Sequence, residues 1–61
     1  MIVKTIINEK VGKKWEIVKH EENKYSVNYY EYFKKGGWEL FKRPIEYYDK
    51  DYIEYIFEIK L

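Results

Sequence analysis

Residues 15–29 read Trp-Glu-Ile-Val-Lys-His-Glu-Glu-Asn-Lys-Tyr-Ser-Val-Asn-Tyr. The first six are rich in β-branched and aromatic residues, and positions 25–29 carry apolar residues at odd numbers, the period of two expected of a strand. Between the two segments, Asn23 tolerates the left-handed backbone conformation that tight turns require. This pattern predicts a β-hairpin, around which the rest of the chain can be placed.

The segments on either side of this hairpin also resemble strands. Residues 2–8 are rich in Ile and Val, and Gly12 then breaks the pattern. Gly36 and Gly37 predict a second reversal. Pro44 lacks an amide hydrogen, so it confines the strand after that reversal to an edge, an end or a bulge. The expected strands are 2–8, 14–20, 24–33 and 38–47.

The last segment has two interpretations. As a strand, Ile53, Tyr55, Phe57, Ile59 and Leu61 alternate with mostly charged residues. As a helix, Asp49 is a suitable N-cap, and an acidic residue follows in the first turn, where the helix dipole favours negative charge. We adopt a helix over residues 50–60. The expected fold is α+β, a four-stranded antiparallel meander followed by one C-terminal helix; the alternative is an all-β five-stranded meander.

Length and composition support one small domain, residues 1–61. The chain has 61 residues, of which 13 are aromatic and 13 are β-branched, so it is rich in strand formers. A chain of this size buries only about 60% of the surface that its unfolded form exposes. It has no Cys, so disulfides and thiolate metal sites cannot supplement the core. It must therefore pack efficiently or pair with another copy.

Several functional classes are disfavoured. One His, one Ser, one Thr and no Cys give a thin basis for nucleophilic catalysis, so we do not expect an enzyme. We expect no cofactor, and no metal site either, because His20, Glu21 and Glu22 are consecutive residues of a turn, which rarely converge on one ion. No apolar run approaches the roughly 20 residues of a membrane span, and the N-terminal apolar stretch is too short for a signal peptide. A cytoplasmic location is the default.

Charge is distributed unevenly although its sum is only +1. Residues 1–43 hold ten basic and six acidic groups, a net of +4, whereas residues 44–61 hold two basic and five acidic groups, a net of −3. Such asymmetry can mark a basic binding surface backed by an acidic element. A solvated surface whose charges divide by chance is the competing interpretation.

Lysines and aromatic residues alternate along the hairpin. A regular strand over 24–33 would place Tyr25, Val27 and Tyr29 on one face, and Lys24, Ser26, Asn28, Tyr30 and Tyr32 on the other. Proteins that bind single-stranded nucleic acids combine basic side chains with exposed rings on which bases stack. Half-buried sheet residues or a dimer interface would use the same aromatic side chains.

The hairpin resembles a known family. The stretch from Val18 to Phe33 is similar, without a gap, to the central hairpin of the single-strand-binding transcriptional coactivator positive cofactor four and its bacterial and phage relatives. Ile45-x-Tyr47 and Tyr52-x-x-Tyr55 look like that family's last strand and the start of its C-terminal helix. The likeness covers residues 14–57. It implies a homodimer with single-stranded DNA lying across the sheets.

Site residues can be carried over by position. The resemblance implies that Lys14, Lys19 and Lys24 contact the nucleic-acid backbone and that Phe33 stacks on a base. A regular strand would place Phe33 on the Val27 face, so its stacking role requires a bulge or a frayed strand end. Three positions depart from the family, because Glu21 replaces an aromatic residue, Glu22 replaces Lys and Tyr30 replaces Arg.

A rival resemblance begins at Gly37-Trp38-Glu39-Leu40. This motif, with Phe57-x-Ile59, is similar to a family of small bacterial domains of unknown function in which a helix ends in Gly-Trp-Glu-Leu and leads into a terminal hairpin. That interpretation makes Ser26 the cap of a helix that extends through Lys35. It places a turn between two strands at residues 49–51.

We expect a dimeric module that binds single-stranded DNA or RNA without sequence preference. The residues expected to contact the backbone are Lys14, Lys19, Lys24, Lys34, Lys35, Lys42 and Arg43. Those expected to stack on bases are Tyr30, Tyr32 or Phe33. The alternative is a small phage or mobile-element protein that binds a host protein through an aromatic-rich interface and inhibits or adapts it.

Overall fold

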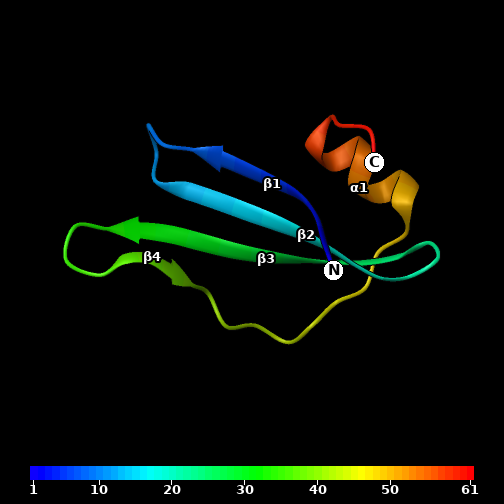
Figure 1. Cartoon of the computed structure of the whole chain (residues 1–61), viewed down its shortest axis with the longest axis horizontal. Helices are drawn as coiled ribbons and strands as arrows, with labels where there is room; N and C mark the ends of the chain where they lie inside the picture. Colours follow the sequence, from blue (N-terminus) through cyan, green and yellow to red (C-terminus); the bar gives the residue numbers. More distant parts are fainter.

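A computed structural model describes all 61 residues and contains a four-stranded antiparallel sheet followed by one helix. The strands lie in the sheet in chain order, so the sheet is a meander (Figure 1). This confirms the α+β prediction. The five-stranded alternative and the rival interpretation with a helix through Lys35 are both wrong. The elements are β1 (Ile2–Asn8), β2 (Lys13–Glu21), β3 (Lys24–Phe33), β4 (Gly37–Leu40) and α1 (Lys50–Phe57).

The central hairpin forms where the sequence predicts it. Asn23 in the turn has a φ of 58°, in the left-handed region. β2 pairs with β3 so that Ile17 lies opposite Val27, and the register is regular from there to the far end of the pair. It shifts only near the turn, between Lys19 and Glu21. β3 is therefore a regular strand whose side chains alternate between the two faces.

The turn between β1 and β2 fits closely against β3. Gly12 has a φ of 65°, which favours glycine, and its carbonyl accepts a hydrogen bond of 2.9 Å from the Tyr32 amide. A Cβ added at Gly12 would lie 3.3 Å from the Cβ of Tyr32. The glycine thus allows the turn to reverse while lying close to the third strand.

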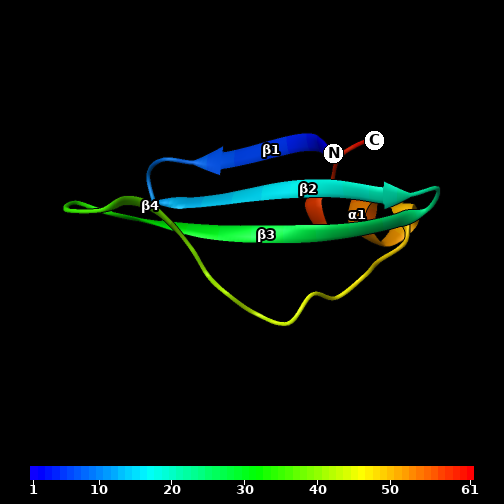
Figure 2. The ribbon, with the colours of Figure 1, turned by 60° about the horizontal axis from the view of Figure 1, so that its bottom comes forward.

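β4 is shorter than the sequence predicted, because it ends at Leu40 rather than at residue 47. Residues 41–47, which we call the strap, bow away from β3 (Figures 1 and 2). The strap is joined to β3 at Tyr29 through Phe41 and at Tyr25 through Tyr48. The anchors are four residues apart in β3 but seven apart between Phe41 and Tyr48, so the connecting segment has three surplus residues and bows away from the edge of β3.

α1 begins as predicted and ends earlier. The Asp49 side chain caps it by accepting a 2.8 Å hydrogen bond from the Tyr52 amide. The predicted end at residue 60 is wrong, because Glu58 adopts the left-handed conformation with a φ of 55° and closes the helix after Phe57. The Asn23 side chain accepts a 2.8 Å hydrogen bond from the Lys50 amide, which ties the hairpin turn to the start of the helix.

The core lies between the helix and one face of the sheet. Its three buried apolar residues, Ile17, Ile53 and Tyr25, are 0%, 1% and 4% exposed. Around them pack the partly buried side chains of Ile6, Val27, Tyr48, Phe57, Ile59 and Leu61. We call this side of the sheet the helix face. The helix falls short of the length and apolar character that a membrane span needs.

Candidate nucleic-acid interface

The opposite side of the sheet, which we call the open face, has no helix against it. Strand pairing defines its members, because residues opposite each other in neighbouring strands point to the same side. β1 contributes Ile2, Thr5 and Ile7, β2 contributes Lys14, Glu16, Val18 and His20, β3 contributes Lys24, Ser26, Asn28, Tyr30 and Tyr32, and β4 contributes Trp38 and Leu40. The face combines rings, aliphatic side chains and two lysines.

A cluster of one lysine and three rings lies at the β4 end of the open face. The Lys14 ammonium lies 4.4 Å from the ring centroid of Tyr30 and 5.1 Å from that of Trp38. Tyr32 meets Trp38 edge to face with centroids 5.3 Å apart, and Tyr32 is 53% exposed. We call these four residues the Lys14 cluster. It places a cation and accessible ring surface side by side, the combination that stacks bases and contacts phosphates.

Tyr30 is held in place by a carboxylate. Its hydroxyl donates a 2.6 Å hydrogen bond to Glu16, and this bond raises the pKa of the Tyr30 phenol, with desolvation and the charge of Glu16 adding to the rise. The bond fixes the ring over β2 beneath Lys14. It also occupies the carboxylate of Glu16, whereas Glu9 lies beside Tyr32 and Trp38 at the edge of the cluster.

A second cluster lies at the other end of the open face. His20 Nε2 and Ser26 Oγ share a 2.7 Å hydrogen bond, and the His20 ring meets Tyr47 edge to face at 5.2 Å. Lys24 places its ammonium 4.4 Å from the centroid of the same Tyr47 ring. The Tyr47 side chain, at the end of the strap, thus packs on the sheet, and a second ring and cation pair forms there.

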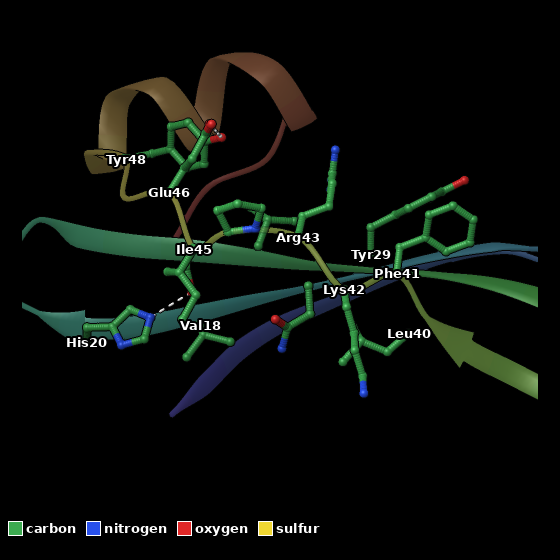
Figure 3. A pocket seen from close by; sticks show the side chains of 14 residues that line it. Val18, His20, Tyr29, Leu40, Phe41, Lys42, Arg43, Ile45, Glu46 and Tyr48 are labelled. Atoms are coloured by element: carbon green, nitrogen blue, oxygen red, sulfur yellow. Dashed lines mark hydrogen bonds between the residues drawn. The ribbon is translucent and has the colours of Figure 1, made fainter.

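A groove separates the strap from the edge of β3. Its volume is about 450 Å³, and β3 forms one wall while residues 40–46 form the other (Figure 3). Val18, His20 and Ser26 line its floor and also belong to the open face. Lys42 and Arg43 extend from the strap in opposite directions (Figure 3). The groove is therefore continuous with the open face and flanked by two cations.

The structure brings together only some of the residues expected to bind. Lys14, Lys24, Tyr30 and Tyr32 share the open face. Lys34 and Lys35 lie in the exposed turn that joins β3 to β4, beyond the Lys14 cluster. Lys42 and Arg43 line the groove.

Lys19 and Phe33 lie on the helix face and are corrections to the expected site. Lys19 pairs with Tyr25 across the hairpin and makes a 3.5 Å ion pair with Glu22. Phe33 alternates with Tyr32 in a strand without a bulge there, so the stacking role that the resemblance implied does not fit its position. Regular alternation places both side chains away from the open face.

Trp38, His20 and Tyr47 were not among the expected site residues. A signal for Trp38 existed, because the turn at Gly36 and Gly37 sets it opposite Tyr32 once the register is known. Tyr47 gave no such signal, since its position depends on how the strap bows. No group of three His, Asp or Glu side chains converges as metal ligands would.

Comparison with known proteins adds no relative. No family model, curated protein or solved structure matches the chain. The function must therefore be inferred from the geometry of the open face and the groove.

Proposed function

We propose that this protein binds single-stranded nucleic acid, DNA or RNA, across the open face without sequence preference. The observation that carries the proposal is the Lys14 cluster, in which a lysine lies over two rings beside an exposed tyrosine. Unpaired bases can stack on these rings, and each stacked base contributes roughly 1–3 kcal/mol. Every base has a ring face, so stacking of this kind does not select a sequence.

The positions of the cations support a path for the strand. Lys34 and Lys35 lie at one end of the open face, the Lys14 cluster follows, and Lys24 with Tyr47 lies at the other end. A strand along this path would meet cations at intervals and rings between them. In this proposal Lys19 makes no contact, because it lies on the helix face.

The proposal includes a homodimer in the cytoplasm. β1 is an edge strand, and its outer side offers backbone groups with which a second copy could pair. Two open faces side by side would double the length of strand that is bound. Light scattering at several protein concentrations tests the assembly, and a monomer at every concentration would contradict it.

Titration with labelled oligo-dT at two salt concentrations tests the function. Binding to phosphates releases counterions, so the affinity should fall steeply with salt, with a slope of about −0.7 per phosphate contacted. The absence of binding at micromolar protein and low salt would overturn the proposal. Changing Lys34 and Lys35 together to Gln should weaken binding and flatten the slope, whereas Lys19→Gln, a control on the helix face, should change neither.

A second candidate function is supported by the outer side of α1. Tyr55 is 80% exposed, and Tyr52 and Ile56 are also exposed on the same helix. This aromatic and aliphatic surface suits a protein partner, such as a host protein that a phage protein would inhibit or adapt. Pull-down from lysate after nuclease treatment separates the two functions. A stoichiometric protein partner that survives nuclease and is lost in Tyr55→Ala would favour this candidate.

A further inference from the structure

The edge of β3 that lines the groove carries backbone groups without backbone partners. Tyr25 uses both its amide and its carbonyl to bond Tyr48, each at 2.8 Å, and the Tyr29 carbonyl accepts from the Phe41 amide at 2.8 Å. Backbone groups two residues apart point to the same edge of a strand. The Val27 amide, the Val27 carbonyl and the Tyr29 amide therefore point toward the strap, yet no strap residue bonds them.

The surplus length of the strap explains this gap. Residues 42–47 bow out between the two anchors, and Pro44 has no amide hydrogen to donate to β3. The Val27 amide, the Val27 carbonyl and the Tyr29 amide therefore form a row of donor, acceptor and donor along one wall of the groove, whose volume is about 450 Å³. Backbone groups in proteins almost always find a partner, so an open row of three is a place where a ligand can supply one.

We propose that this groove receives one unpaired base of the bound strand, and that Val27 and Tyr29 hydrogen-bond to its Watson–Crick edge. This inference rests on the function proposed above. Each of the four bases presents an adjacent donor and acceptor on that edge, so a backbone row accepts any of them. Thymine or uracil can donate its imide N–H to the Val27 carbonyl, while a neighbouring base oxygen accepts from the amide of Val27 or of Tyr29.

The same contact gives a physical basis for preferring single strands. In a duplex the Watson–Crick edges are already paired and lie inside the helix, where a strand edge cannot reach them. An unpaired strand can turn its bases outward and offer these edges to a protein. The groove opens onto the open face at Val18, His20 and Ser26, so a strand stacked on that face can direct one base into it.

Amide hydrogen exchange by NMR tests the contact directly, with oligo-dT as the probe. The Val27 and Tyr29 amides should both exchange fast in the free protein, and the one that bonds the base should exchange about fivefold or more slowly at saturation, the effect of one ordinary hydrogen bond. The comparison probe is a strand of N3-methylthymidine of the same length, which keeps its phosphates and rings but blocks the edge. It should bind at least about fivefold more weakly and leave both amides unprotected.

Two other results would overturn the inference in distinguishable ways. If Trp38 shifts on binding but the Val27 and Tyr29 amides do not respond, the strand binds the open face and the groove is not used. If neither Trp38 nor these amides respond to oligo-dT, the proposed function fails and the inference fails with it.

A matched pair of variants provides a second test. Ile45 lines the groove and is exposed, so Ile45→Trp should fill the groove without disturbing the core. This variant should lose the discrimination between oligo-dT and the N3-methylated strand. Tyr55→Trp on the outer side of α1 should keep it. Equal discrimination in the two variants would contradict the role of the groove.

Discussion

The two faces of the sheet carry similar residues in different surroundings. On the helix face, Ile17 and Tyr25 are buried beneath Ile53 of α1. On the open face, Lys14 lies over Tyr30 and Trp38, Tyr32 packs against Trp38, and no helix covers them. Aromatic content therefore does not indicate which side of a small sheet is the core. The position of the helix does, and the face without a helix stays exposed.

The largest contrast between the faces should be in stability. Ile17→Ala removes a fully buried side chain from a three-residue core and should lower the free energy of unfolding by about 2–5 kcal/mol. Single cores of this size rarely supply more than about 3–5 kcal/mol, so this variant should be largely unfolded. Circular dichroism and urea denaturation measure the effect.

Ile7→Ala is the matched control for that variant on the open face. Ile7 is also a strand isoleucine, but it is 50% exposed, so its loss should cost less than about 1 kcal/mol. Equal destabilisation by the two substitutions would show that the open face is covered in solution, for example by a second copy.

The second contrast should be in affinity. Trp38→Ala removes the largest ring of the Lys14 cluster and should weaken oligo-dT binding about tenfold or more, as expected for one lost stacking contact. Phe33→Ala removes a ring from the helix face and should change the affinity by less than about twofold. Fluorescence anisotropy measures both. A larger effect of Phe33→Ala would reverse the assignment of the faces.

A third contrast separates the helix from binding. Asp49→Ala removes the cap of α1 and should cost about 1 kcal/mol of stability, while the folded fraction keeps its affinity for oligo-dT. Asp49→Asn keeps a capping oxygen and should be nearly as stable as the original chain. Urea denaturation and anisotropy on the same samples check the two expectations. A loss of affinity in the folded fraction would mean that α1 takes part in binding.

The smallest effect concerns a property that both faces share. Tyr30 on the open face and Tyr29 on the helix face each donate a hydrogen bond to a glutamate, which raises the pKa of each phenol above 10.0. A raised pKa stabilises the fold below the unfolded value, and this contribution disappears as the pH rises through the folded pKa. Ultraviolet titration should therefore show late-ionising tyrosines, and Tyr30→Phe should remove one of them. If Tyr30→Phe leaves the number of late-ionising tyrosines unchanged, the hydrogen bond between Tyr30 and Glu16 is contradicted.

Local signals predicted much of the fold. Asn23 marked the hairpin turn, Gly12 marked the first reversal and Asp49 marked the start of the helix. Each of these residues has a conformational or capping property that acts on its nearest neighbours in the chain. The period of two in β3 likewise predicted its two faces, including the Val27 side for Phe33.

The ends of elements and the groove could not be predicted in this way. The end of β4 depends on two anchors, at Tyr25 and Tyr29, that are distant in sequence from the strap. The end of α1 depends on a left-handed Glu58, a residue type with no preference for that conformation. The groove results from a mismatch of three residues between two paired segments, which appears only when the register of both ends is known.

The meander order also bears on how the chain reaches its folded state. Each strand of the sheet pairs with its neighbour in sequence, so loop closure is short and the sheet can form quickly. The helix joins only after the strap has been spanned, so we expect it to dock last. Trp15 touches Phe57 of α1, with centroids 6.2 Å apart, whereas Trp38 touches Tyr32 within the sheet. Trp15 also packs on Tyr29 of β3, so its fluorescence should report both steps, and a Trp38→Phe variant would isolate its signal from that of the sheet-only indole.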